Sequence, residues 1–400
     1  MLKRLHLLLA LFILTVNAAM AQITTSGISG KITSDGENVI GATVTATHQP
    51  SGTVYRAVTN IDGRYTIQGM RPGGPYKVDI SYIGYKDKVI KNLNLSLGET
   101  ENISCSLQED AHQLQEVVVS GKAGLAASRT GAATSMTAEQ INNMPSITHG
   151  IADVARLNPQ LTVTNSGNMS FAGVNNRYNN FMIDGAANND VFGLASSGNN
   201  GGQAGAQPVS METIEQIQVS VAPFDVRQSG FTGGAINAIT KSGTNQFHGS
   251  AYYYGYNQDL IGTKYPYLDG TGYAPKYQKQ TQYNMGVTLG GPIIKNKLFF
   301  FANYERTNKE YPNLYGVDSG NSKVNTEQAK DILTMLQKIA EKQGVNFNDY
   351  YSNQDIYTKS DKAGLKLDWN INEFNKFAIR WSLVKAEQLS GGGSASSLNS

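Results

Sequence analysis

Strict alternation of apolar and polar side chains in two segments near the C-terminus, 361–369 and 374–384, is the feature that most constrains the fold. The apolar positions are Ala363, Leu365, Leu367, Trp369, Phe377, Ile379, Trp381 and Leu383. The positions between them are Gly364, Lys366, Asp368, Lys376, Ala378, Arg380 and Ser382. Because successive side chains of a strand point to opposite faces, this period of two predicts β-strands with one apolar and one water-facing side.

The connections between the predicted strands alternate in length. The candidate strands are 248–257, 281–290, 297–306, 361–369 and 374–384. The intervals 258–280 and 307–360 are long, whereas 291–296 and 370–373 are short. Short turns on one side and long loops on the other are typical of transmembrane β-barrels, in which the apolar face meets lipid. The alternative, a soluble β-sandwich, does not account for this alternation of long and short connections.

Five strands cannot close a barrel, and an open sheet edge is not tolerated in lipid. Large plugged barrels have roughly 22 strands. We therefore expect the 246–400 region to be the N-terminal part of a barrel that belongs to a longer protein. The long interval 307–360 contains apolar residues at helical spacing between positions 329 and 340, with Asn325 or Thr326 as the cap and Gly344 as the end.

The N-terminus has the features of a secretory signal peptide. Lys3 and Arg4 precede the apolar run 7–16, and Ala19 and Ala21 form a small-residue cleavage site. We expect export, with residues 1–21 removed. The net charge of +2, spread along the chain, does not suggest a nucleic-acid partner. The single cysteine, Cys105, cannot form an intrachain disulfide, and its alternation with neighbouring apolar residues favours a core position over a reactive thiol.

Residues 22–108 show short alternating runs separated by tight turns, which predicts a small antiparallel β-sandwich. The region resembles the carboxypeptidase regulatory-like domain, a transthyretin-like sandwich, in the residues GISGKIT, VIGATVTA and TNIDGRYTIQGMRPGGPYKVDISYIGYK. This resemblance implies no catalytic residues, and a spacer or interaction role is expected.

A polar linker, 109–122, contains one β-prone segment, which consists of Leu114, Gln115, Glu116, Val117, Val118 and Val119. Such a segment can complete the exposed sheet edge of a partner. It can also be one more strand of the preceding sandwich. Its position between two modules favours a free segment.

Residues 123–245 are predicted to form an α+β unit. Thr137 and Gln140 make a capping box for one short helix, and a second short helix precedes Pro159. Asp184-Gly185 marks a hairpin turn, and strands are expected at 217–221 and 233–240.

A more specific resemblance covers nearly the whole mature chain and is carried by two segments between positions 171 and 254. It rests on FAGVNNRYNNFMIDGAANND and METIEQIQVSVAPFDVRQSGFTGGAINAITKSGTNQFHGSAYYY. These residues resemble the plug and first barrel strand of TonB-dependent outer-membrane receptors, above all the OmpA-related branch with an N-terminal regulatory-like domain. The resemblance implies a mainly β protein made of a sandwich, an α+β plug and the first strands of an incomplete barrel.

The same resemblance implies a function and partners. The expected function is import of an unidentified ligand through the plugged barrel, energised by the TonB–ExbB–ExbD complex, with residues 114–119 in the place of the TonB box. A surface lipoprotein is a further candidate partner, because a glycan-importing branch shares the sandwich. A binding or signalling protein that uses the scaffold without transport is the alternative.

No enzyme is expected, because the five histidines are scattered and none has a metal-ligand or nucleophile–base spacing. No catalytic residue, metal or cofactor is predicted. Asp184 and Asp190 read either as paired carboxylates or, as we favour, as turn and loop residues. The candidate ligand-binding residues are Asn175, Asn176, Arg177, Tyr178, Asn179 and Asn180, whose alternative role is hydrogen bonding inside the plug.

Overall fold

The structure of the chain is a computed structural model that describes residues 24–109, 117–120, 132–144, 146, 149–164, 168–190, 192, 195, 197–221, 232–260, 279–311, 326–344, 355–373 and 375–389. The predicted signal peptide and the first three residues of the 114–119 segment lie outside these ranges. The described chain is mainly β, as the sequence predicts.

A β-sandwich forms the N-terminal unit. Its first sheet contains β1 (Ser26–Ser34), β2 (Glu37–Asn38), β5 (Arg64–Met70), β8 (Thr100–Asn102) and β9 (Cys105–Ser106). Its second sheet has the order β10-β7-β6-β3-β4, from β10 (Val117–Ser120), β7 (Lys88–Leu95), β6 (Gly73–Ser81), β3 (Thr43–His48) and β4 (Thr53–Val58). Alternate apolar residues of both sheets meet in one core, which includes Ile28, Val44 and Tyr76. Cys105 packs against this core, and burial raises the pKa of its thiol.

The second unit is α+β. Its five-stranded sheet has the order β11-β16-β17-β14-β15, from β11 (Ala132–Thr137), β16 (Ile214–Val221), β17 (Gly234–Thr240), β14 (Asn180–Ile183) and β15 (Ala186–Ala187). The helices α2 (Ala138–Asn143) and α3 (Ile151–Ala155) pack with a small hairpin, β12 (Leu161–Val163) and β13 (Met169–Phe171), on the core of this sheet. Three 3₁₀ turns, η1 (Asn176–Tyr178), η2 (Gly202–Ala204) and η3 (Met211–Thr213), lie in its connections.

Local sequence signals of this unit are confirmed. Thr137 and Gln140 form both hydrogen bonds of the capping box at the start of α2. Asp184 and Gly185, with φ of 49° and 81°, make the two-residue turn between β14 and β15. Such turns need left-handed backbone at both central positions, which Asp and Gly tolerate better than most residues.

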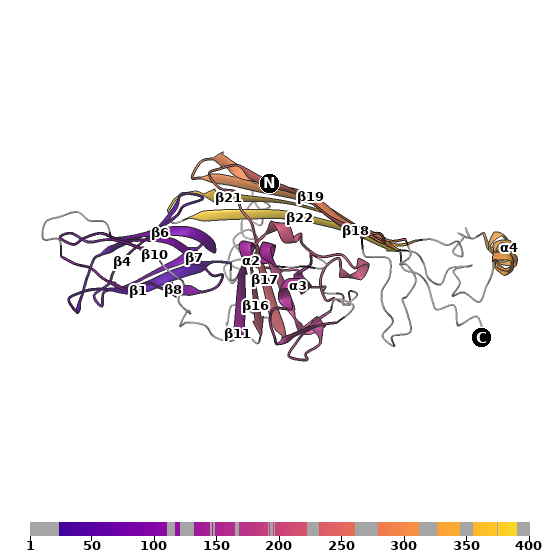
Figure 1. Cartoon of the computed structure of the whole chain (residues 1–400), viewed down its shortest axis with the longest axis horizontal. Coiled ribbons are helices and arrows are strands. Elements are labelled where there is room, and N and C mark those ends of the chain that lie inside the picture. Colours follow the sequence, from indigo (N-terminus) through magenta and orange to yellow (C-terminus); the bar gives the residue numbers. More distant parts are fainter. Residues whose placement is uncertain are drawn as a thin grey trace, which may run out of the picture.

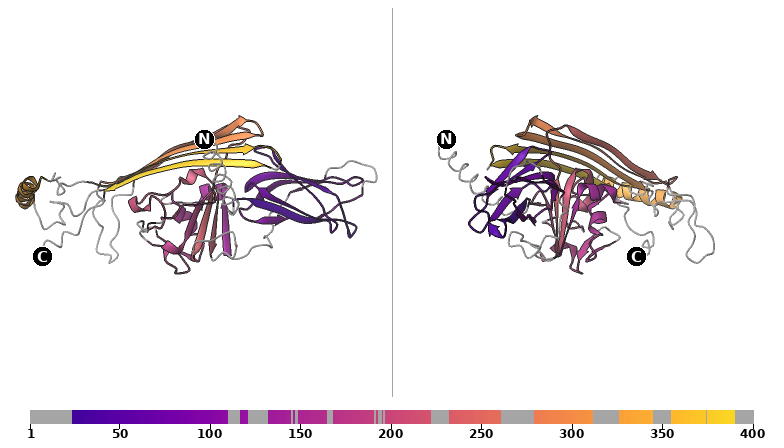
Figure 2. Two further views of the ribbon diagram at one scale, coloured as in Figure 1. Left: turned by 180° about the vertical axis from the view of Figure 1, so that it is seen from behind. Right: turned by 60° about the vertical axis from the view of Figure 1, so that its left-hand side comes forward.

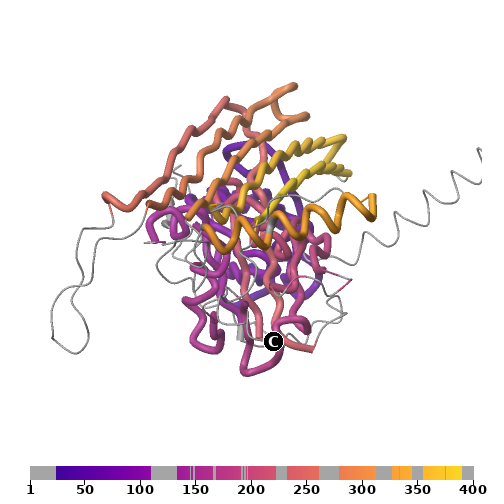
Figure 3. The backbone as a smooth tube through the Cα atoms, turned by 90° about the vertical axis from the view of Figure 1, so that its right-hand side faces the viewer, coloured from indigo at the N-terminus to yellow at the C-terminus, as the bar shows by residue number. Residues whose placement is uncertain are grey.

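Five long strands form the third unit. They pair antiparallel in chain order as β18 (His248–Asn257), β19 (Thr281–Ile294), β20 (Leu298–Tyr311), β21 (Ile356–Asn370) and β22 (Lys376–Leu389). All five predicted strands are present, and the last four are longer than the sequence predicts. The sheet arches over the α+β unit, and the sandwich lies at one end of its strands (Figures 1 and 2). Viewed along the long axis, the sheet is a curved wall beside the other two units (Figure 3).

The predicted facing of β21 and β22 is confirmed. Leu365, Trp369, Ile379 and Trp381 are 42%, 46%, 54% and 56% exposed on the convex face. Lys366 and Asp368 are buried on the other face, Lys366 against Asp184 of the α+β unit and Asp368 against Arg71 of the sandwich. The two short connections lie at the end of the sheet that carries the sandwich (Figure 1). The strand ends that lead into the two long intervals lie at the opposite end, and helix α4 (Thr326–Gln343) ends before Gly344 as predicted.

Within the described ranges, no helix combines the length and the apolar character needed to cross a membrane.

Candidate functional site

Asp184 joins the α+β unit to the curved sheet of β18 to β22, which is called the barrel wall after its predicted role. Its carboxylate accepts hydrogen bonds from the backbone N–H (2.9 Å) and the hydroxyl (2.6 Å) of Thr240, which fix it at the end of β17. Lys366 Nζ lies 3.3 Å from Oδ1, and Arg380 Nε lies 3.4 Å from Oδ2. Lys366 also donates to the carbonyl oxygen of Thr240 at 3.0 Å. One carboxylate thus binds cations from two neighbouring wall strands, β21 and β22.

A second buried group connects the same two units. Glu305 of β20 is 6% exposed, and its carboxylate accepts hydrogen bonds from Ser210 Oγ (2.6 Å) and Tyr252 OH (2.7 Å). Lys362 Nζ lies 2.5 Å from the other carboxylate oxygen. Since an unpaired buried charge is costly, the charge of Glu305 is retained by these three partners. Ser210, which precedes η3, is the partner from the α+β unit.

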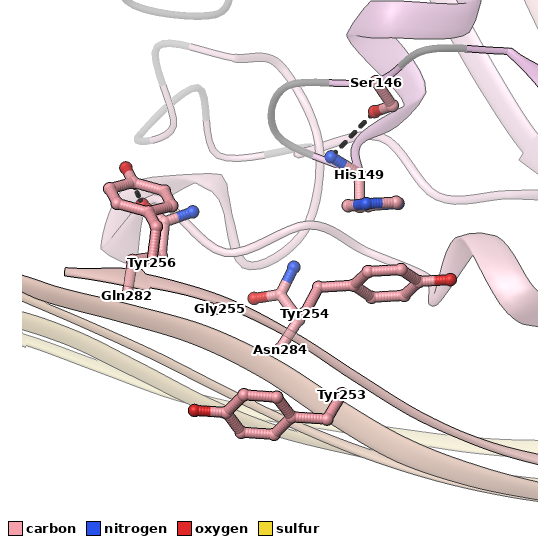
Figure 4. Close-up of a pocket in the computed structure, with 8 residues that line it drawn as sticks. All are labelled: Ser146, His149, Tyr253, Tyr254, Gly255, Tyr256, Gln282 and Asn284. Atoms are coloured by element: carbon pink, nitrogen blue, oxygen red, sulfur yellow. Dashed lines mark hydrogen bonds between the residues drawn. The ribbon is translucent and has the colours of Figure 1, made fainter. Parts of the chain in front are cut away.

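A hollow of about 380 Å³ lies between the α+β unit and the barrel wall (Figure 4). His149 stacks on Tyr254 with ring centroids 3.9 Å apart, and Tyr256, Gln282 and Asn284 continue the lining. Tyr253 lies on the opposite side of its strand from His149, as alternation in β18 requires. Aromatic rings and amide groups together can stack on and hydrogen-bond a polar ligand.

The sandwich is fixed to the short turns of the barrel. Arg56 donates to Glu373 at 2.8 Å, and Asn370 Nδ2 donates to Thr53 Oγ1 at 2.9 Å. Lys376 Nζ lies 3.1 Å from the centroid of the Tyr55 ring. Behind this contact, Thr53 continues a buried hydrogen-bonded chain through Ser51 to His48. Burial, with Arg71 and Lys376 nearby, lowers the pKa of His48 to about 3.

The sandwich also contacts the α+β unit through buried amides. The N–H of Leu97 donates to Gln216 Oε1 at 2.8 Å, and Gln218 Nε2 donates to the Leu97 carbonyl oxygen at 2.9 Å. Both glutamines lie on β16 and are only 2% and 7% exposed. The side-chain amides of the α+β unit thus satisfy a backbone donor and a backbone acceptor of the sandwich. These hydrogen bonds fix the position of the two units relative to each other.

The structure places half of the 114–119 segment. Val117, Val118 and Val119 belong to β10, which pairs in parallel with β7 at the edge of the second sandwich sheet. The described part of the segment is therefore not free, and it takes the position that the sequence left open as one more sandwich strand. Leu114, Gln115 and Glu116 are outside the described residues.

Residues 175–180 lie around turn η1, and several of their side chains hydrogen-bond inside the α+β unit. Asn175 Oδ1 accepts from the N–H of Arg177, and Asn179 Nδ2 donates to the Met169 carbonyl at 2.7 Å. Asn180 is 6% exposed and accepts from Asn189 Nδ2. Tyr178, 59% exposed, presents its ring to solvent.

Asp184 and Asp190 have different partners, so they do not act as a pair of carboxylates. Asp184 serves the hairpin turn and the barrel wall, and Asp190 accepts from the N–H groups of Phe192 and Ala195. Within the described ranges, no group of three or more His, Cys, Asp or Glu side chains is placed to hold a metal ion. The sequence predicted neither the Glu305 cluster nor the Leu97 contacts, because their members are far apart in the chain.

Three family matches cover successive parts of the chain. Residues 27–108 match the carboxypeptidase regulatory-like domain, residues 126–236 the TonB-dependent receptor plug domain, and residues 239–317 an outer membrane beta barrel domain. The three matches follow the order of the three units described above.

Two curated proteins that are similar to this chain are described as TonB-dependent. The TonB-dependent transporter Oar of Myxococcus xanthus is 29% identical over 273 residues, which is 65% of this chain and 24% of Oar. The probable TonB-dependent siderophore receptor PirA of Acinetobacter baumannii is 25% identical over 188 residues, which is 43% of this chain and 22% of PirA. The crystal structure of that organism's siderophore receptor PirA has a TM-score of 0.43 at 19% identity, covering 65% of this chain and 32% of that one.

The chain has the domain order of the N-terminal part of a TonB-dependent receptor, namely a regulatory-like sandwich, a plug and part of a barrel, which places it in the outer membrane. It spans about a quarter of the length of the curated relatives that it matches. From here the α+β unit is called the plug.

Proposed function

We propose that the whole protein is an energy-coupled transporter in which the plug closes the barrel and a pull from TonB moves the plug to admit ligand. The observation that supports this proposal most is the plug–barrel contact through Asp184. Ion pairs with Lys366 and Arg380 lie on the wet face of strands whose other face is apolar. Charged groups that lose their partners can be hydrated when a plug moves, unlike the residues of a packed apolar core.

The proposed domain limits follow the sequence prediction. They are 1–21 for the signal peptide, 22–108 for the sandwich, 109–122 for the linker with the coupling segment, 123–245 for the plug and 246–400 for the barrel part. TonB, with ExbB and ExbD, is the proposed partner of residues 114–119. A surface lipoprotein partner stays a prediction.

The ligand is proposed to contact the plug and the adjacent wall. The hollow beside His149 and Tyr254 offers stacking rings and amides, and residues 175–180 add the exposed ring of Tyr178. Because PirA is described as a siderophore receptor, ferric siderophores are the first compounds to assay. No observation favours the alternative of a surface binding or signalling protein that does not transport.

Val118→Pro in the full-length protein tests the coupling segment. Strand addition relies on backbone N–H donors, and proline removes one and fixes φ, so pairing of this segment with a partner should fail. We expect uptake of ⁵⁵Fe-labelled siderophores from a defined panel to fall at least tenfold, to the level of a strain without TonB. Surface binding of the same compounds should persist.

Lys122→Pro is the matched control, since it places proline in the same linker but beyond the segment. Its uptake should equal that of the wild type. Loss of binding and surface abundance in Val118→Pro would mean that the segment is purely structural. Uptake that is equal with and without TonB would contradict the proposed function as a whole.

A further inference from the structure

The outer edge of β7 holds the last three residues of the proposed coupling segment. β7 pairs antiparallel with β6 on one side and parallel with β10 on the other. The Cα partners run from Val117 with Lys88 to Ser120 with Lys91. A strand addition site is thus filled by a segment of the same chain.

The sandwich that carries β7 is itself anchored. Arg56, Thr53 and Tyr55 contact the short barrel turn around Glu373 and the adjoining strand ends, and the Leu97 backbone binds two glutamines of plug strand β16. Any force that acts on β10 while it is paired with β7 is therefore borne by the sandwich and, through it, by the barrel wall.

The order of the elements in the chain makes this arrangement mechanically significant. The chain leads from β10 to β11, the first strand of the plug sheet. A pull applied to residues 114–119 reaches β11 only through β10. As long as β10 stays on β7, no tension passes along the chain to β11.

We propose that the β7 edge is a latch for the coupling strand: β10 rests there, and its release must precede the transfer of tension to the plug. This inference rests on the proposed function, because it assigns a resting position to the same segment. It gives the sandwich a specific task, which is to hold the coupling strand until a partner pulls on it.

The relative strength of the pairings supports this sequence of events. The latch has four Cα pairs in parallel, whereas β11 and β16 share six antiparallel pairs. Parallel pairing is slightly weaker per residue, so the latch is the weaker of the two junctions. Under tension it should open before β11 leaves the plug sheet.

The test uses a disulfide between β10 and β7 in the full-length protein with Cys105→Ser as background. Val118→Cys is combined with Val89→Cys, its Cα partner across the pair. Neighbouring strands lie roughly 5 Å apart, within the Cα separation that disulfides accept. The control combines Val118→Cys with Val58→Cys, since β4 is at the opposite edge of the sheet.

The first readout is disulfide formation in outer membranes under mild oxidation. We expect the 118–89 pair to cross-link nearly completely and the 118–58 pair to remain reduced. Equal, low cross-linking of both pairs would overturn the latch. This readout does not involve TonB, so it stands even where the proposed transport function fails.

The second readout is single-molecule force spectroscopy with the purified C-terminal domain of TonB on the probe. Pulling on the reduced receptor should give an early short extension, followed by the longer extension of the plug. The oxidised receptor should release TonB without plug extension. Equal plug extension in both states would overturn the latch, whereas failure of TonB to bind the reduced receptor would contradict the proposed function instead.

Discussion

The Asp184 side chain makes most of its contacts at the boundary between the plug and the barrel wall. It ends a hairpin strand with left-handed backbone, accepts two hydrogen bonds from Thr240, and faces two cations of the barrel wall. The sequence predicted the turn from Asp-Gly. It could not predict the pairing with Lys366, because that residue is 182 positions away and only the folded chain brings the two together.

Asp184→Asn should loosen the plug from the wall. The substitution keeps the shape and the turn but leaves Lys366 and Arg380 facing a neutral group. Loss of charge-assisted bonds at a mostly buried site costs about 2–4 kcal/mol. We expect a lower thermal unfolding midpoint of the purified full-length protein in detergent.

Asp361→Asn is the control for that experiment. Asp361 pairs with Arg306 across two strands, and the two side chains are 37% and 42% exposed. An exposed pair contributes about 0–1 kcal/mol. If both substitutions lower the midpoint equally, Asp184 has no special role in holding the plug.

His48 makes the stability of the sandwich pH-dependent. Its pKa falls from 6.5 to about 3 on folding, mainly through burial, so the folded state keeps the imidazole neutral. Below pH 6.5 the unfolded chain binds a proton that the folded chain does not, so stability is lost as the pH falls. Between pH 6.5 and 5 the loss should be about 2 kcal/mol.

Thermal unfolding of the purified full-length protein at pH 6.5 and at pH 5 measures this slope, because the full chain keeps Lys376 and the barrel turn against the sandwich. The His48→Asn variant should be less stable at neutral pH but should lack most of the dependence between pH 6.5 and 5. The same slope in the variant and the wild type would assign the acid sensitivity to other groups.

At the scale of elements, the strands and short helices were predictable because their signals are local. The sequence pattern located all five wall strands and the facing of the last two, and the capping box located α2. The pairing partners of strands are set by contacts across the molecule. The parallel pairing of β10 with β7 is such a case, because nothing in the local sequence around 118 indicates that it pairs with the residues around 89.

The two faces of β22 should tolerate charge very differently. Ile379→Arg puts a cation on the convex face, where Ile379 is 54% exposed, and should cost roughly 2–4 kcal/mol if the position is at the bilayer midplane. Ala378→Arg, one residue away on the opposite face, should be tolerated. Heat-modifiable migration of the assembled full-length barrel on gels measures both, and equal assembly of the two variants would mean that this sheet does not face lipid.

At the scale of the whole molecule, three units are held by polar contacts at their boundaries. The plug meets the wall at Asp184 and Glu305, and the sandwich meets the wall at its short turns and the plug at Leu97. The sequence predicted the three units in order but not these junctions. Each junction joins residues 42 to more than 300 positions apart, beyond the reach of any local pattern.

The central claim is that TonB moves the plug away from the barrel wall. Ser210 tests it directly, because this plug residue is 2% exposed and bonded to Glu305 and Tyr252 of the wall. The measurement is labelling of Ser210→Cys by a membrane-impermeant maleimide in cells, in the Cys105→Ser background. Ile61→Cys, at a position that is 75% exposed on the sandwich, normalises reagent access.

We predict at least fivefold faster labelling of Ser210→Cys in energised cells with TonB than in cells without it, with Ile61→Cys labelled equally in both. Labelling of Ser210→Cys at the same rate in the two strains would contradict the account.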